Sequence, residues 1–338
     1  MMNSTELSLI VAVAAAISAG IILVLRPWLQ RYLLAHPNAR SSHRQSTPQG
    51  GGIAVIVATL AVAASFAAVG LHEPSFDPAA LRLVFAATAL MMLVGAADDL
   101  WTIEVAPRLL LQALAVGIML ASLPEELRVI PMLPWWFERT LLLLACLWFV
   151  NLTNFMDGID WMTVAEFVPI TVGLTLIGFL GALPAEGIVV AMALGGGLIG
   201  FAPFNKPVAR IFLGDVGSLP IGILLSWLLV QVAGLGYLTA ALVLPLYYLA
   251  DATLTLLRRL ANREPFWRAH RTHFYQLATD RGFTVSEIVA HVFGTNLALV
   301  ALAATSSLWP GFLSTMAALG GGGALVGWLL VRFSRGKS

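Results

Sequence analysis

The chain reads Leu141-Leu-Leu-Leu-Ala-Cys-Leu-Trp-Phe-Val150 and continues without a break into Asn151-Leu-Thr-Asn154-Phe-Met-Asp157-Gly158-Ile-Asp160-Trp161. The first run is typical of a membrane helix. On one continuing helix, steps of three residues drift around the axis, so Asn151 and Asp160 would point to opposite sides. Gly158 is a natural place for the helix to end. The stretch therefore predicts a helix with a polar mouth, and a plain polar exit from the bilayer is the alternative.

The composition is that of a membrane protein. Of 338 residues, 59% are hydrophobic and 11% are charged, whereas about 25% are charged in soluble domains. The net charge is +1 and no basic run resembles a nucleic-acid-binding arm. The lone Cys146 lies inside the apolar run, which excludes an internal disulfide and a cysteine metal site.

Eleven apolar segments are long enough to cross a bilayer, and they predict an all-α polytopic protein. The segments are 7–25, 51–71, 81–97, 107–123, 139–155, 163–183, 185–202, 216–233, 236–257, 285–305 and 311–332. The first has no positive residues before it, so we expect a retained helix and not a cleaved signal peptide. No loop is long enough for a second folded domain, so we expect one integral-membrane domain over 1–338.

The lysines and arginines predict an orientation. If the first segment enters from outside, 16 of the 19 positive residues fall on one side, which the positive-inside rule makes cytoplasmic. The N-terminus would then be outside and the C-terminus inside. The clusters of polar and acidic residues all fall on the cytoplasmic side. A transporter or lipid flippase, the alternative class, would be expected to carry ionisable groups near the bilayer midplane. The pattern therefore favours an enzyme that works at the inner surface.

Acidic residues mark two helix ends on that side. Asp98 and Asp99 end a helix, where they oppose the helix dipole and each other. One could hold a cation while the other acts as a base or orienting group, and a simple marker of the membrane edge is the alternative. Asp215, in Phe212-Leu-Gly214-Asp215-Val-Gly217-Ser218, opens another helix. It is either a plain N-cap or part of a phosphate site at the helix N-terminus. In a phosphate site, a cation such as Mg²⁺ would have to bridge the two anions.

Two long polar loops add basic groups to the same side. The first carries Arg40 and His43 and leads into Gly50-Gly51-Gly52, where glycines at a helix start could cradle phosphate. Positive flanking residues in a flexible loop are the alternative. The second carries His270 and His273, for which an interfacial basic loop is the alternative.

The ninth segment contains two unusual residues. Asp251 is a rare acid within an apolar segment, and pairing with Arg258 is the structural alternative to a functional role. Pro245 removes a backbone hydrogen bond and predicts a kink. Such a kink could open a sideways groove for a lipid chain, although proline is also tolerated in membrane helices for packing. Taken together, the clusters favour phosphoryl transfer between a charged cytosolic donor and a lipid acceptor.

In order along the chain, these motifs resemble the polyprenyl-phosphate N-acetylhexosamine-1-phosphate transferases of glycosyltransferase family 4. This family includes enzymes that start O-antigen and other surface glycans, and the phospho-MurNAc-pentapeptide translocase. The similar elements are Pro37-Asn-Ala-Arg40-Ser-Ser-His43, Asp98-Asp99, Asn151 through Asp160, Asn205 through Pro207, Ile211 through Ser218, Asp251, and Arg271-Thr-His273.

The resemblance implies a substrate pair and a cofactor. The donor would be a UDP-N-acetylhexosamine and the acceptor undecaprenyl phosphate, with Mg²⁺ or Mn²⁺ required. The products would be an undecaprenyl-diphosphate-sugar and UMP. The enzyme would lie in the bacterial cytoplasmic membrane with its site on the cytoplasmic face, and a homodimer is an open alternative.

The resemblance also implies residue roles. Asp215 and Asn154 would hold the metal, while Asp98 and Asp99 would be catalytic residues near the acceptor phosphate, one of them as its base. Asp157 would be a further catalytic residue on the nucleotide-sugar side. The residues expected to bind substrate are Asn151, Asp160, Asn205, Arg40, His43, Asp251, Arg271 and His273.

Two departures from the family pattern point to a subgroup. His273 is followed by Phe274-Tyr275-Gln276, where many members have two further histidines, and Trp161 replaces a glycine. The form His-Arg-Thr-His-x-Tyr-Gln resembles the enzymes that initiate O-antigen and related glycans, and it argues against the peptidoglycan translocase. The CDP-alcohol phosphatidyltransferases need Ala-Arg after Asp-Gly-x-x, which Asp157-Gly-Ile-Asp160-Trp-Met lacks.

Overall fold

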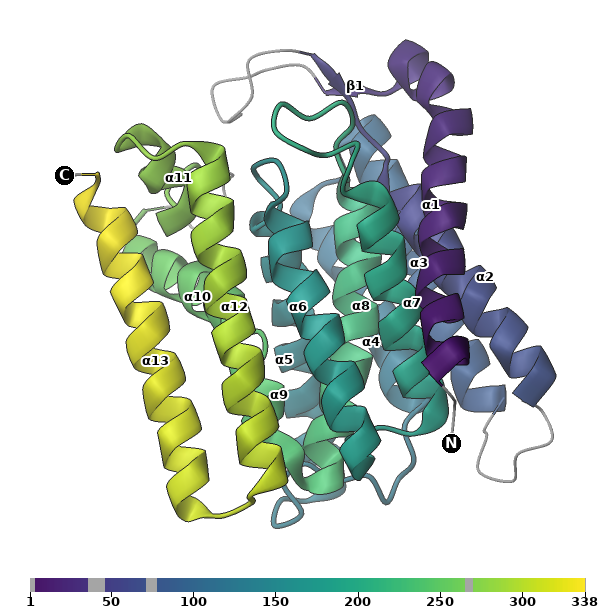
Figure 1. Ribbon diagram of the computed structural model, residues 1–338, viewed down its shortest axis with the longest axis vertical. Coiled ribbons are helices and arrows are strands. Elements are labelled where there is room, and N and C mark those ends of the chain that lie inside the picture. The colour runs from purple at the N-terminus through teal and green to yellow at the C-terminus, as the bar shows by residue number, and fades with distance from the viewer. Residues whose placement is uncertain (1–3, 36–45, 71–77, 265–269, 338) are drawn as a thin grey trace.

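The computed structural model describes residues 4–35, 46–70, 78–264 and 270–337 (Figure 1). The helices are α1 (Ser4–Tyr32), α2 (Gly52–Gly70), α3 (Pro78–Trp101), α4 (Val105–Ala121), α5 (Trp135–Phe155), α6 (Met162–Ile177), α7 (Ala185–Phe201), α8 (Asp215–Val232), α9 (Leu238–Val243), α10 (Leu246–Ala261), α11 (Phe274–Asp280), α12 (Val285–Leu308) and α13 (Phe312–Arg335). Two π-helical turns, η1 (Gly178–Ala182) and η2 (Ala233–Tyr237), extend α6 and α8. Strands β1 (Leu34–Ala35) and β2 (Thr47–Pro48) form a short antiparallel pair.

Within the described part of the chain, seven helices are long and apolar enough to cross a membrane. Three shorter apolar helices cover Gly52–Ala68, Val105–Ala121 and Ala185–Phe201. This confirms the predicted class of a helical, multi-pass membrane protein. The count of eleven crossings and the orientation stay predictions.

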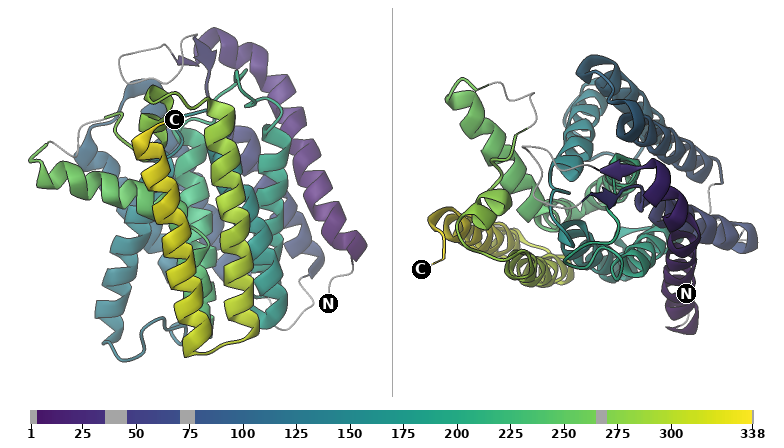
Figure 2. Two further views of the ribbon diagram at one scale, coloured as in Figure 1. Left: turned by 60° about the vertical axis from the view of Figure 1, so that its left-hand side comes forward. Right: turned by 90° about the horizontal axis from the view of Figure 1, so that it is seen from above.

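The ninth predicted segment, 236–257, is not one helix, so the prediction of a single span there is wrong. The helix ends at Val243, and α10 begins at Leu246 directly after Pro245. Proline has no N–H, and its ring clashes with the carbonyl one turn earlier in a helix. The kink predicted at Pro245 is therefore a full break, after which α10 projects sideways from the bundle (Figure 2, left).

The projecting helix α10 is amphipathic. Its exposed leucines Leu254, Leu257 and Leu260 recur at helical spacing on one face. Its opposite face is buried and carries Tyr247, Tyr248, Asp251, Ala252, Thr255 and Arg259.

The central helix is α8, which is buried along almost its whole length. It packs against α2, α3, α4, α5 and α7. The C-terminal ends of α3, α5 and α7 and the N-terminal end of α8 lie at the same end of the bundle (Figure 1). The motifs at these four helix ends therefore meet at one end of the bundle, as predicted.

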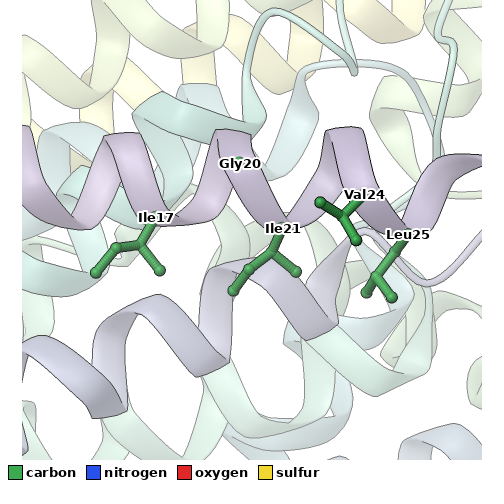
Figure 3. Close-up of a pocket in the computed structure, with 5 residues that line it drawn as sticks. All are labelled: Ile17, Gly20, Ile21, Val24 and Leu25. Carbon is green, nitrogen blue, oxygen red and sulfur yellow. The ribbon is translucent and has the colours of Figure 1, made fainter.

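An apolar hollow of about 470 Å³ lies along α1 (Figure 3). It is lined by Ile17, Gly20, Ile21, Val24 and Leu25, all from α1. A lining without charged or hydrogen-bonding side chains suits lipid and not a nucleotide sugar.

Candidate active site

The carboxylate of Asp99 joins the end of α3 to the start of α8. Its Oδ1 accepts the N–H of Asp215 and its Oδ2 accepts the N–H of Val216, both at 3.1 Å. These N–H groups have no acceptor within the helix, so Asp99 caps α8 and places its charge at the positive end of the helix dipole. Gly214 permits the approach, because its φ is +77° and a Cβ there would lie 2.7 Å from Asp99 Oδ2. The N-terminus of α8, considered above as a phosphate site, is therefore already occupied by a carboxylate.

Asp98 has a different set of partners. Its Oδ2 lies 2.7 Å from Arg108 Nη1, and its Oδ1 accepts the N–H of Ile103 at 2.6 Å. Its side chain also lies within hydrogen-bonding reach of Asp215. The adjacent acids thus have different partners, because neighbouring helical side chains point in different directions. Three carboxyl groups from α3 and α8 gather at one point.

The amide of Asn154 completes this cluster from α5. Its Nδ2 donates to Asp215 Oδ1 at 2.7 Å and to Ser218 Oγ at 3.0 Å. The two residues expected to share a metal ion are therefore direct neighbours, although they lie 61 positions apart in the sequence.

Asp157 lies in the loop that follows α5. The hydroxyl of Thr163 donates to its Oδ1. Burial raises the pKa of Asp157 from 3.8 to about 7, the charges of Asp99 and Asp160 add to the rise, and the Thr163 hydrogen bond opposes it. Asp157 therefore titrates near neutral pH.

The donor set suits a hard divalent cation. Asp215 is half-buried beside the carboxyls of Asp98 and Asp99, an arrangement that a cation would relieve. In the described ranges, no group of three His, Cys, Asp or Glu side chains is arranged to hold a metal alone. Mg²⁺ is commonly bound by one or two carboxylates, with water and substrate phosphates completing its shell. Asp215 and Asn154 fit that pattern.

Two residues expected to bind substrate connect neighbouring loops. Asp160 Oδ2 accepts the N–H of Ala209 at 2.9 Å, and Asn205 Oδ1 accepts the N–H of Trp161 at 2.7 Å. The indole N–H of Trp161 donates to the carbonyl of Ala202 at 2.6 Å. The α5–α6 and α7–α8 loops therefore form one platform beside the carboxyl cluster.

Asn151 serves a similar structural purpose inside the bundle. Its Nδ2 donates at 2.8 Å to Gln112 Oε1 of α4 and at 2.8 Å to the carbonyl of Leu147. The side chain is buried, so it fixes α5 against α4.

Asp251 and His273, both expected to bind substrate, have buried side chains. The break before α10 turns Asp251 inward. There it accepts the N–H groups of Phe274 at 2.9 Å and Tyr275 at 3.1 Å, and so caps α11. His273 Nδ1 lies 3.3 Å from the same carboxylate.

The remaining basic groups of this region lie around α11. Arg258 donates to the carbonyl of Thr272 at 2.5 Å, so it stabilises the backbone of the loop that precedes α11. Arg271 contacts Thr279 at 2.8 Å and Asp280 at 3.1 Å. Burial lowers the pKa of His270 to about 4, so this ring is neutral at pH 7.

The glycine run that enters α2 does not cradle phosphate through Gly51 and Gly52, so that prediction is wrong for these two residues. Their N–H groups donate to the carbonyls of Phe212 and Leu213, each at 2.9 Å. A Cβ on Gly52 would lie 2.1 Å from the Cα of Gly217, so the run permits close packing of α2 on α8. Arg40 and His43, expected to bind substrate, lie outside the described residues.

Sequence reasoning missed several residues that shape the site. Arg108 lies near the start of the next helix, shortly after the acid pair in the sequence. This short separation could have indicated the ion pair with Asp98. Thr163, Glu166 and Tyr275 gave no signal, because their partners come from distant parts of the chain.

Comparisons with known proteins identify a family and relatives to which this chain is similar. Residues 81–233, which contain the acid pair and Asp215, match the model of glycosyl transferase family 4. A probable undecaprenyl-phosphate N-acetylglucosaminyl 1-phosphate transferase of Bacillus subtilis (strain 168) is 24% identical over 320 residues, covering 88% of this chain and 86% of that protein.

Two further relatives are similar over shorter ranges. A phospho-N-acetylmuramoyl-pentapeptide-transferase of Leuconostoc citreum (strain KM20) is 33% identical over 53% of this chain and 60% of its own length. A decaprenyl-phosphate N-acetylglucosaminephosphotransferase of Mycolicibacterium smegmatis is 27% identical over 57% of this chain and 52% of its own length. The match of residues 81–233 to the model of glycosyl transferase family 4 bears out the resemblance that the ordered motifs led us to expect.

Proposed function

We propose that this protein transfers N-acetylhexosamine 1-phosphate from a UDP-N-acetylhexosamine to undecaprenyl phosphate. One observation carries the proposal: α3 and α8 bring Asp99 and Asp215 into one carboxyl cluster, beside Asn154 and at the end of a membrane bundle. Two of its relatives are named as transferases for undecaprenyl phosphate and decaprenyl phosphate, and this supports the same reaction class.

The reaction joins two phosphates. An oxygen of the acceptor phosphate attacks the sugar-bearing phosphorus of the donor. The bond from that phosphorus to the bridging oxygen breaks, and UMP leaves with the electron pair. Both reactants are anionic, so the site must supply positive charge and alignment. When bound, Mg²⁺ or Mn²⁺ would compensate the charge of the diphosphate and of the departing UMP.

The three acids have separate tasks in this proposal. Asp99 holds α8 in place, since both of its oxygens accept N–H groups of that helix. Asp98 forms an ion pair with Arg108 and so holds its guanidinium in place. Among the contacts described above, this is the positive group nearest to the acid pair. Asp157 has the pKa of about 7 that suits a base taking the last proton of the acceptor phosphate.

The pathway is proposed from the sequence motif around Arg271 and His273. We place the enzyme in the bacterial cytoplasmic membrane, with the site on the cytoplasmic face where UDP-sugars are available. The product would start a surface polysaccharide such as an O-antigen in lipopolysaccharide biosynthesis.

The test is turnover by the purified protein in lipid nanodiscs. Donors would be UDP-GlcNAc, UDP-GalNAc and their 6-deoxy counterparts, each with undecaprenyl phosphate and Mg²⁺. We expect one donor to give equal amounts of UMP and lipid-linked sugar, and no UMP when the acceptor is omitted. A lipid flippase, the alternative class, would move lipid without releasing UMP, and that result would overturn the proposal.

A further inference from the structure

A buried glutamate stands at the break between α9 and α10. Glu166, on α6, is fully buried. Its Oε1 accepts the N–H of Tyr248 at 3.3 Å, and its Oε2 accepts the Nδ2 of Asn296 at 2.6 Å. One carboxyl group therefore joins α6, α10 and α12.

This contact supplies an N-terminal cap that α10 lacks in its own sequence. The cap position is Pro245, whose side chain has no acceptor. The first N–H groups of a helix have no intrahelical partner, and Tyr248 carries one of them. In a helix continuing through residue 245, that N–H would bond to the carbonyl of Leu244 instead. Glu166 therefore stabilises the broken arrangement over the straight one.

The helix that Glu166 caps reaches the end of α5. The hydroxyl of Tyr248 donates to the carbonyl of Met156 at 3.4 Å. Asp251 of the same helix caps α11, and from there the hydroxyl of Tyr275 donates to the carbonyl of Phe155 at 3.1 Å. These two carbonyls lie at the end of α5, where helix carbonyls lack intrahelical partners, and Asp157 follows directly.

A series of contacts thus connects Glu166, through Tyr248 and Tyr275, to the backbone that precedes Asp157. We infer that Glu166 is a positioning residue for Asp157: by capping α10 it fixes the Phe155–Asp157 backbone in the orientation that transfer requires. The inference rests on the proposed function, since that proposal makes Asp157 the base of the transfer reaction.

The main test is a double-mutant cycle that combines Glu166→Ala with Asp157→Asn. Loss of position at a catalytic group can cost about 10- to 100-fold in rate, so we expect Glu166→Ala to lower kcat per folded protein by that factor. In the Asp157→Asn background we expect no further loss, because the group that Glu166 positions is gone. Equal losses in both backgrounds, or no loss in either, would overturn the inference.

The conservative variant separates the cap from general packing. In Glu166→Gln, one amide oxygen can still accept the N–H of Tyr248. The amide nitrogen can donate to Asn296 Oδ1, a buried atom without a hydrogen-bond partner here, once the Asn296 amide turns over and gives up its hydrogen bond to the carbonyl of Ala165. We therefore expect this variant to keep most of the wild-type kcat. A Gln variant as slow as the Ala variant would contradict the inference.

Glu138 provides a matched control. It is also a buried glutamate that accepts main-chain N–H groups, those of Val129 and Ile130, but it lies at the opposite end of α5. Glu138→Gln should lower thermal stability without changing kcat per folded protein.

If Glu166→Ala cannot be recovered folded, a second variant tests the same contacts. Tyr275→Phe removes only the hydroxyl that donates to the carbonyl of Phe155. It should lower kcat in the wild-type background alone, and an unchanged kcat would overturn the inference.

Hydrogen exchange keeps the two proposals distinguishable. If the wild-type protein releases no UMP with any donor, the proposed function fails whatever Glu166 does. Amide exchange over residues 155–161 would still report the positioning. Faster exchange in Glu166→Ala than in Glu138→Gln supports it, and equal exchange overturns it.

Discussion

Asp99 accepts the N–H of Asp215 at 3.1 Å, so the acid that ends α3 is the cap that begins α8. The relationship joins two motifs that lie 116 residues apart in the sequence. It also places Asp215 within reach of Asn154, whose amide donates to it at 2.7 Å. The geometry of the proposed metal site therefore depends on a hydrogen bond made by the backbone of one of its ligands.

Removing this cap should damage both stability and turnover. Loss of an N-cap costs about 1 kcal/mol, so Asp99→Ala should lower the melting temperature and also abolish UMP release. Asp99→Asn keeps one acceptor oxygen and should recover part of the stability. Thermal melts in detergent and the transfer assay would measure the two effects. Glu125→Ala, an exposed acid at the opposite end of the bundle, should change neither. An Asp99→Ala protein with wild-type melting and turnover would contradict the role of the cap.

Loss of either proposed metal ligand should stop transfer while the protein remains folded in the membrane. Asp215→Ala and Asn154→Ala should each lower kcat by about 100-fold or more, because the charge of the diphosphate is left without its cation. Titration with Mg²⁺ would show whether Asn154→Ala needs more metal for its residual turnover. Near-normal turnover of either variant in Mg²⁺-containing buffer would remove the metal assignment.

The pH profile should report Asp157. Its pKa is raised to about 7, so the carboxylate form needed in a base is present above that pH and is lost below it. We expect kcat/KM to fall as the pH drops through about 7. The acceptor phosphate titrates in the same range, so the comparison must be made with Asp157→Asn. That variant should be slow and should lack the part of the pH dependence that belongs to the carboxyl. An identical profile in both proteins would assign the titration to the substrate.

Much of this architecture could be predicted from the sequence, because apolar length and helix-ending residues are local properties. Asp98, Asp99 and Asp215 mark the ends of real helices, and the helix containing Leu141–Val150 ends at Phe155, next to Asp157. These residues meet at one end of the bundle because the helices cross the same slab in alternate directions.

The partners of the polar side chains could not be predicted in the same way. Asp251 caps α11 and Glu166 caps α10, and each contact depends on a packing arrangement between distant segments. The sequence at Gly51 and Gly52 allows a phosphate cradle because glycine permits close approach of any group. Here the group that approaches is the backbone of another segment, at Phe212 and Leu213.

The predicted orientation can be tested with single cysteines in a Cys146→Ala background. Asn262 is exposed at the end of α10, and Gly311 is exposed between α12 and α13 at the opposite end of the bundle. On intact cells, an impermeant thiol reagent should label Gly311→Cys and should label Asn262→Cys only after permeabilisation. The reverse pattern would place the carboxyl cluster on the outer face, away from cytosolic UDP-sugars.

The break at Pro245 offers a test of where the lipid enters. Two interactions compete for the N–H of Tyr248: the carboxylate of Glu166, seen here, and the carbonyl of Leu244, which a straight helix would use. Pro245→Ala restores a backbone N–H and removes the ring clash, which together cost about 3 kcal/mol in a helix interior. The variant should therefore populate a straighter arrangement.

In a straighter helix, α10 would no longer project sideways from the bundle, and its exposed face of Leu254, Leu257 and Leu260 would move with it. If undecaprenyl phosphate approaches along that face, Pro245→Ala should raise the apparent KM for the lipid and leave the KM for the UDP-sugar almost unchanged. Pro220→Ala, a proline inside the central helix α8, is the comparison for a general effect of removing proline. If both KM values rise together in Pro245→Ala, or if neither does, the break serves packing alone and the lipid reaches the carboxyl cluster by another path.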